Sequence, residues 1–150
     1  MARVISVKQE SFPIAGTFTI SRGSKTQADV IVCTIRERHH NGRGECVPYR
    51  RYGETMESVF SALLAMAPRV EAGIGRAELL DAMPAGAARN AIDCALWDLD
   101  AKASGISVAS RLGVSPRPLE TAYTLSLDTP EAMAAQARAN AGRPLLKVKI

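Results

Sequence analysis

A strand–helix–strand pattern over residues 119–150 constrains the fold more than any other feature of this sequence. Residues 119–127 are strand-like, the run Asp-Thr-Pro-Glu that begins at Asp128 is a helix-start signal with proline at the first helical position, and an alanine-rich segment then ends at Gly142. A second strand-like segment, Leu145–Ile150, follows at once. With a crossover of only about a dozen residues between them, the two strands are predicted to pair in parallel as a βαβ unit.

The second of these strands carries two lysines. Because side chains alternate between the faces of a strand, Lys147 and Lys149 share one face, and the other face carries Leu146, Val148 and Ile150. Two interpretations follow from the strand alone. A half-buried strand could present the lysines to water, or the apolar face could pack on an outer helix and leave both lysines inside the mouth of a barrel.

The segments before residue 115 predict an α+β domain. A first strand covers residues 3–12, and a second, residues 28–38, returns through Asn41-Gly42 as a hairpin in which adjacent histidines at the tip are solvated rather than metal-binding. Residues 15–27 look like a long loop that bears Phe18, Ile20 and Arg22. Long ordered loops are often functional, but an ordinary hairpin connection with an exposed arginine is the alternative.

Two helices complete this part of the chain. Thr55 is the expected N-cap of the first, in which Pro68 marks an end or a kink. The second runs from about residue 87 to residue 104 and stops at Gly105, and its aspartates suit solvated or ion-paired roles. Glu45 could be a functional carboxylate or a structural anchor for a neighbouring loop. The run Ser115-Pro-Arg-Pro indicates a linker between two domains, residues 1–115 and 116–150.

Composition excludes several partners. The 19 Lys+Arg exceed the 15 Asp+Glu by 4, but apart from residues 36–43 the basic residues are scattered and only 5% of residues are aromatic, which argues against nucleic acid. A signal peptide and a long apolar run are both missing, so no membrane partner is expected. Three cysteines without a CxxC pair, Cys33, Cys46 and Cys94, suit small buried side chains in a reducing compartment. A cytoplasmic location is therefore expected.

The order and spacing of short motifs resemble the enolase superfamily, specifically its branch of muconate-lactonising enzymes and dipeptide epimerases. The motifs are Gly42-Arg-Gly-Glu45 with Pro48, Tyr52-Gly-Glu-Thr55, Ala91-Ile-Asp-Cys-Ala-Leu-Trp-Asp-Leu99, Leu112-Gly113, Tyr123-Thr-Leu-Ser-Leu-Asp-Thr-Pro-Glu-Ala-Met133 and Leu146-Lys-Val-Lys149. The resemblance implies a capping (lid) domain with a three-stranded antiparallel sheet and helices, followed by the start of a (β/α) barrel. Because such a barrel needs about 200 residues or more, the chain is expected to hold only its first βαβ unit and to be inactive alone.

The resemblance also implies a reaction. Enzymes of this family remove a proton from the carbon next to a carboxylate with a lysine base, and Mg2+ stabilises the enediolate. The base in relatives is the second lysine of the Lys-x-Lys pair, which is Lys149 here, and a position near the carboxyl end of a barrel strand agrees with that role. Lys147 is expected to assist by disfavouring a second positive charge beside it. The magnesium carboxylates and the opposite-face acid are not expected in this portion.

In relatives, two loops of the lid select the substrate, and here they correspond to residues 15–27 and 49–52. Arg22 matches an arginine of glutamate-specific dipeptide epimerases, and Thr124 matches a threonine in the same pocket; Phe18, Ile20 and Tyr52 are the other expected contacts. The resemblance thus implies an acidic dipeptide, L-Ala-D/L-Glu from peptidoglycan recycling, and a homo-oligomer. The alternatives are muconate cycloisomerase, o-succinylbenzoate synthase, N-acylamino acid racemase, and a non-catalytic α+β binding or assembly module.

Overall fold

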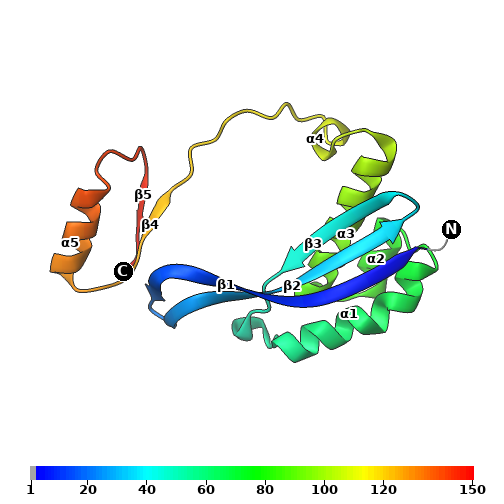
Figure 1. Ribbon diagram of the computed structural model, residues 1–150, viewed down its shortest axis with the longest axis horizontal. Coiled ribbons are helices and arrows are strands. Elements are labelled where there is room, and N and C mark those ends of the chain that lie inside the picture. Colours follow the sequence, from blue (N-terminus) through cyan, green and yellow to red (C-terminus); the bar gives the residue numbers. More distant parts are fainter. Residues whose placement is uncertain (1–2) are drawn as a thin grey trace. The chain divides into compact units, whose positions relative to one another are not determined.

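A computed structural model describes residues 3–150, which divide into two compact units (Figure 1). The first contains the chain up to Ser11 together with Asp29–Ser115, and the second contains Phe12–Ala28 together with Pro116–Ile150. The division therefore separates the chain after Ser115 and also groups residues 12–28 with the second unit.

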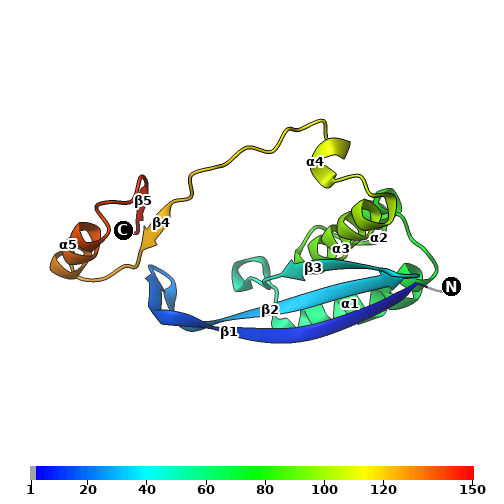
Figure 2. The ribbon, with the colours of Figure 1, turned by 45° about the horizontal axis from the view of Figure 1, so that its top comes forward.

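A three-stranded sheet in the order β1-β2-β3 is the first layer (Figure 2). Its strands are β1 (Val4–Ile20), β2 (Gly23–Glu37) and β3 (His40–Cys46). Residues 15–27 are therefore not a long loop: β1 and β2 run through them and join at a two-residue turn, Ser21-Arg22. The alternative of a hairpin connection with an exposed arginine describes the local structure, because polar and apolar residues that alternate weakly can still pair along a ladder.

The turn between β2 and β3 lies three residues before the predicted one. Glu37 pairs with His40, so Arg38 and His39 form the turn, and Arg38 adopts a left-handed φ of 54°. The prediction of a turn at Asn41-Gly42 is wrong, since both residues belong to β3 and pair with Arg36 and Ile35. Gly42 is needed for another reason, which is the close approach of a helix.

That helix, α3 (Ala87–Ser104), packs its backbone directly against β3. A Cβ atom at Gly42 would overlap the carbonyl oxygen of Ala95, and one at Gly44 would overlap that of Ala91. Because Gly42 and Gly44 have no Cβ atom, the strand can approach the helix backbone at Ala91 and Ala95. The helix ends as predicted at Gly105, whose φ is 69°.

The remaining elements of the first unit close the core. Helix α1 (Met56–Glu71) begins at Thr55, the predicted N-cap, which forms a capping box with Ser58, and the helix accommodates Pro68 in its last turn. The short helices are η1 (Arg50–Tyr52), α2 (Arg76–Ala82), which was not predicted, and α4 (Val108–Arg111). The buried core joins one face of β2 to the helices through Ile31, Cys33, Ile35, Leu63, Val70, Leu79, Ile92 and Leu99.

The second unit contains the predicted βαβ element. Strands β4 (Tyr123–Leu125) and β5 (Leu146–Val148) pair in parallel, and α5 (Pro130–Ala139) connects them. The Thr129 hydroxyl caps α5 by accepting a hydrogen bond from the Ala132 N–H at 3.3 Å. The βαβ prediction is confirmed, but both strands are shorter than predicted because only three residue pairs form the ladder.

Candidate functional site

Parallel pairing sets the lysines and Thr124 on one face of the small sheet. Thr124 is aligned with Lys147, and aligned residues of neighbouring strands project to the same side. Lys149 follows β5 directly, two positions after Lys147 and at the carboxyl end of the strand. Lys147 is exposed, whereas Lys149 and Thr124 are half-buried. Two ammonium groups and a hydroxyl are thus presented where a carboxylate-bearing ligand could bind.

The tip of the β1–β2 hairpin is hydrogen-bonded to the residues that follow Thr124. The Thr19 N–H donates to the Ser126 Oγ at 2.7 Å, and the Leu127 N–H donates to the Thr19 carbonyl oxygen at 3.0 Å. The Ser126 hydroxyl lies 3.3 Å from the Thr17 carbonyl oxygen, to which it donates. These contacts lie within the second unit and attach the hairpin to the end of β4.

Three expected contact residues lie on this hairpin. Phe18 and Ile20 occupy alternate positions of β1, so they share one side of the strand, and both are half-buried. Arg22 lies in the turn and is exposed. The second unit therefore carries Phe18, Ile20, Arg22, Thr124 and both lysines, whereas Tyr52 belongs to the first unit.

Tyr52 lies in a short segment that a glutamate secures. The ring of Tyr52 is 5.7 Å from that of Tyr49, and the Tyr52 side chain is largely exposed. The Glu54 carboxylate accepts hydrogen bonds from the Tyr49 N–H at 3.0 Å and from the Ala87 N–H at 2.7 Å. It therefore joins this segment to the start of α3. Glu45, which the sequence left open as a functional carboxylate or a loop anchor, is exposed on β3, and the carboxylate that anchors this segment is that of Glu54.

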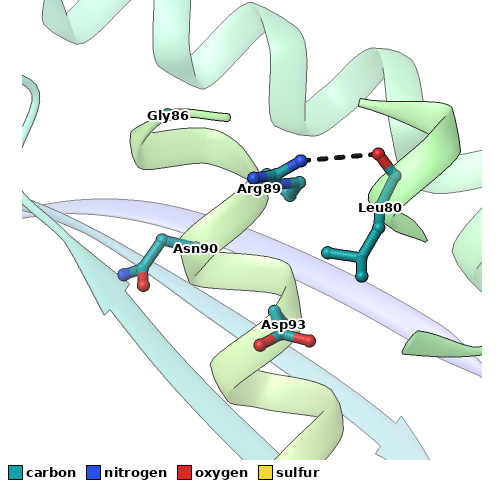
Figure 3. Close-up of a pocket in the computed structure, with 5 residues that line it drawn as sticks. All are labelled: Leu80, Gly86, Arg89, Asn90 and Asp93. Carbon is teal, nitrogen blue, oxygen red and sulfur yellow. Dashed lines mark hydrogen bonds between the residues drawn. The ribbon is translucent and has the colours of Figure 1, made fainter. Parts of the chain in front are cut away.

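Two cavities lie in the first unit. One of about 450 Å³ is bordered by Tyr49, Tyr52 and Glu54. The other, of about 310 Å³, is lined by Leu80, Gly86, Arg89, Asn90 and Asp93 (Figure 3). The guanidinium of Arg89 donates to the carbonyl oxygens of Leu80 at 3.4 Å and of Met83 at 3.2 Å, so its role there is structural.

Residues 3–150 contain no group of three histidine, cysteine, aspartate or glutamate side chains that could hold a metal ion. Asp98 shows how the helix aspartates are used instead: its carboxylate accepts from the Arg43 N–H at 2.8 Å and from the Lys102 ammonium at 2.6 Å. Partial burial acts to raise the pKa of Asp98, but these two hydrogen bonds together lower it below its usual range. The described residues do not fit a magnesium site.

The cysteines are free thiols of two kinds. Cys33 and Cys46 are buried as predicted, whereas Cys94 is exposed on α3, so the prediction of a buried side chain is wrong for Cys94. Burial, with a smaller effect of Cys46, raises the pKa of Cys33 to about 12. Burial, followed by Glu54, raises the pKa of Cys46 to about 11. Both buried thiols are therefore neutral core groups rather than nucleophiles.

Within residues 3–150, the helices are each too short or too polar to cross a membrane.

Comparison with known proteins identifies the family. Residues 2–113 match the N-terminal domain of mandelate racemase / muconate lactonizing enzyme. The L-Ala-D/L-Glu epimerase of Escherichia coli K12 is 44% identical over 151 residues, which cover 99% of this chain and 47% of that protein.

Solved structures agree with this match. An enolase family member from Agrobacterium tumefaciens with homology to dipeptide epimerases, bound to sodium and L-Ala-L-Glu, is 57% identical with a TM-score of 0.95 and covers 98% of this chain and 45% of that one. A dipeptide epimerase from Methylococcus capsulatus, complexed with Mg and L-Arg-D-Lys, is 30% identical with a TM-score of 0.81 and covers 100% of this chain and 46% of that one.

The chain spans about half the length of the relatives it matches. Its sheet and helices are those of the N-terminal capping domain, and the expected fold class, a capping domain followed by the beginning of a barrel, is confirmed. The chain therefore belongs to the mandelate racemase / muconate lactonizing enzyme family, in the branch of the enolase superfamily that contains the dipeptide epimerases.

Proposed function

We propose that this chain is part of a dipeptide epimerase that inverts the α-carbon of an acidic dipeptide, L-Ala-D/L-Glu. The observation that carries the proposal is the shared face of Thr124 and Lys147, with Lys149 next on that face at the carboxyl end of β5. The 57% identical relative bound to L-Ala-L-Glu supports the choice of substrate. A cytoplasmic, homo-oligomeric enzyme of peptidoglycan recycling would fit this activity.

In the proposed reaction, Lys149 is the base that takes the proton from the α-carbon. The electron pair left on that carbon delocalises into the adjacent carboxylate, which becomes an enediolate. Lys147, one position along the same face, keeps positive charge beside the site. Inversion then requires a proton donor on the opposite face, which a part of the protein outside this chain would supply. We also propose Mg2+ as the cofactor because related epimerases are complexed with Mg; its ligands would lie outside residues 3–150.

Arg22 is the residue proposed to recognise the acidic side chain. A guanidinium presents paired N–H donors that match a carboxylate in a bidentate arrangement. Thr124 would donate a further hydrogen bond, and Phe18 and Ile20 on the same unit would exclude water from the bound dipeptide. A substrate with a glutamate side chain fits this set better than an apolar one.

Isotope exchange in the full-length protein tests the reaction. The protein is incubated in heavy water with L-Ala-L-Glu and Mg2+, and deuteration at the α-carbon is followed by NMR. We expect exchange that disappears in Lys149→Ala and persists in Lys8→Ala, a control that removes an exposed lysine of β1. Absence of exchange in the unchanged protein with every dipeptide would reject the epimerase in favour of a cycloisomerase, o-succinylbenzoate synthase or non-catalytic module.

A second pair of variants tests the substrate. Arg22→Ala should reduce kcat/KM for L-Ala-L-Glu by about a hundredfold and leave turnover of L-Ala-L-Ala largely unchanged, because only the former needs the guanidinium. Lys25→Ala, which removes another exposed cation of the same hairpin, is the matched control. Equal losses on both dipeptides in Arg22→Ala would reject the acidic-substrate assignment, and preference for an N-acylamino acid would favour the racemase alternative.

A further inference from the structure

The Ser126 hydroxyl has a position that the proposed reaction does not use. It lies two residues after Thr124, directly after the end of β4 at Leu125. Its oxygen accepts a hydrogen bond from the Thr19 N–H at 2.7 Å, and its O–H donates one to the Thr17 carbonyl oxygen at 3.3 Å. One hydroxyl therefore bridges two backbone groups of the hairpin.

The backbone that Ser126 holds lies among the proposed substrate contacts. Thr19 is the residue between Phe18 and Ile20. A hydrogen bond to its N–H therefore restrains the backbone that carries both neighbouring side chains. The Leu127 N–H adds a bond to the Thr19 carbonyl oxygen at 3.0 Å, and the Thr19 hydroxyl lies 2.9 Å from that of Ser24 across the hairpin. Thr19 is thus attached both to the end of β4 and to the returning strand, and Arg22 lies in the turn between these attachments.

We infer that Ser126 is a positioning residue for substrate selection. It fastens the hairpin of residues 12–28 to the first barrel strand, so that Phe18, Ile20 and Arg22 stand in a fixed relation to Thr124. Its effect on catalysis rests on the proposed function, because a substrate must bridge the hairpin and the lysine strand. A hydroxyl that both donates and accepts is required; an alanine leaves two backbone groups without this partner.

Amide hydrogen exchange in the full-length protein tests the attachment without relying on activity. Ser126→Ala should speed exchange in peptides covering residues 13–25 by about tenfold, while peptides of α3 keep their protection. Ser126→Thr, which keeps a hydroxyl, should restore protection, and Ser61→Ala on the exposed side of α1 is the control. Unchanged protection of residues 13–25 in Ser126→Ala would overturn the inference.

Kinetics separate positioning from a general structural role. In Ser126→Ala we expect KM for L-Ala-L-Glu to rise about three- to tenfold with kcat nearly unchanged, because Lys149 lies on another strand. Ser126→Thr should restore KM. Lower kcat at unchanged KM would indicate only a loss of folded enzyme and would reject the positioning role.

The two proposals fail in different ways. If the unchanged protein causes no α-deuteration of any dipeptide, the proposed function fails. The amide hydrogen exchange of residues 13–25 alone then decides whether Ser126 positions the hairpin. If the protein is an epimerase and Ser126→Ala keeps both protection and KM, the proposed function stands and this inference fails.

Discussion

At the scale of single residues, glycines on β3 decide how closely a helix can pack. Gly42 and Gly44 alternate with exposed residues along the strand and face α3. The helix atoms nearest to them include the backbone of Ala91 and Ala95. A glycine in a strand commonly marks such a close approach, and here the missing Cβ, not a special φ, is the reason for it.

Gly44→Ala should therefore destabilise the fold. The new Cβ would overlap the Ala91 carbonyl oxygen and lie 2.8 Å from the Ala95 nitrogen, so the strand and the helix must separate. We expect a loss of about 1–3 kcal/mol or more in the free energy of unfolding. The urea midpoint measures it, with Gly142→Ala as control because nothing lies within 4 Å of the added atom there. Equal midpoints for the two variants would contradict this packing.

The buried thiols make stability depend on pH in the alkaline range. The ordinary pKa of a thiol is 9.0, and that of Cys33 rises to about 12 in the fold. Below pH 9 Cys33 keeps its proton in both the folded and the unfolded state, and its contribution to the free energy of unfolding is complete. As the pH rises from 9 toward 12, only the thiol of the unfolded chain ionises, so the free energy of unfolding falls. The slope for Cys33 approaches about 1.4 kcal/mol per pH unit.

Urea midpoints between pH 8 and pH 10.5 measure this slope. Because lysines and tyrosines also titrate in this range, the unchanged protein is compared with Cys33→Ala. The urea midpoint of Cys33→Ala should fall less steeply with pH. Cys94→Ala, which removes an exposed thiol, should change the slope less. Identical slopes in all three proteins would show that Cys33 ionises as readily in the fold as in the unfolded chain.

At the scale of elements, Glu54 connects the Tyr49–Tyr52 segment to α3. Its two carboxylate oxygens accept one backbone N–H each, from Tyr49 and from Ala87, and the second of these belongs to the first turn of α3. Negative charge at a helix N-terminus is favourable because the first N–H groups of a helix have no partner within it.

Glu54→Ala should cost about 1–3 kcal/mol, since it leaves two backbone donors without this acceptor. Glu54→Gln should cost less because the amide keeps one acceptor oxygen. Thermal unfolding compares both variants with Glu45→Ala, which removes an exposed carboxylate of β3. A loss in Glu45→Ala equal to that in Glu54→Ala would return the anchoring role to Glu45.

At the scale of the whole molecule, the two units differ in how completely they bury apolar surface. The first unit has a continuous core, whereas in the second Leu125 is buried and the neighbouring Tyr123, Leu145, Val148 and Ile150 are exposed. A parallel pair of strands is normally covered on both faces, so this surface suits coverage by further protein.

The 150-residue chain by itself is therefore expected to self-associate through the second unit. Val148→Lys should reduce the association, because it places a charge in the middle of the exposed apolar face of β5. Val114→Lys is a matched control, since Val114 is 56% exposed and Val148 is 55% exposed. Sedimentation velocity measures the species, and a monomeric chain or equal effects of both variants would contradict the expectation.

Local chemistry was sufficient for the features that depend on residues close together in the chain. The Thr55 cap, the course of α3 to Gly105, the Thr129–Pro130 helix start and the parallel βαβ unit follow from capping, periodicity and short connections. The alternation of Lys147 and Lys149 likewise needs only the period of a strand. The catalytic roles of these lysines and the contacts of Arg22 and Thr124 stay predictions.

Only the tertiary structure decided the features that depend on segments far apart. The β2–β3 turn lies at Arg38-His39 rather than at Asn41-Gly42, because Gly42 and Gly44 belong to the part of β3 that contacts α3. Residues 15–27 are largely strand because the long strands β1 and β2 pair with each other. Glu54 and Ser126 look like ordinary polar residues in the sequence, since their partners are backbone groups 33 and 107 residues away. Such backbone partners carry no side-chain signature, so their positions emerge only when packing brings the segments together.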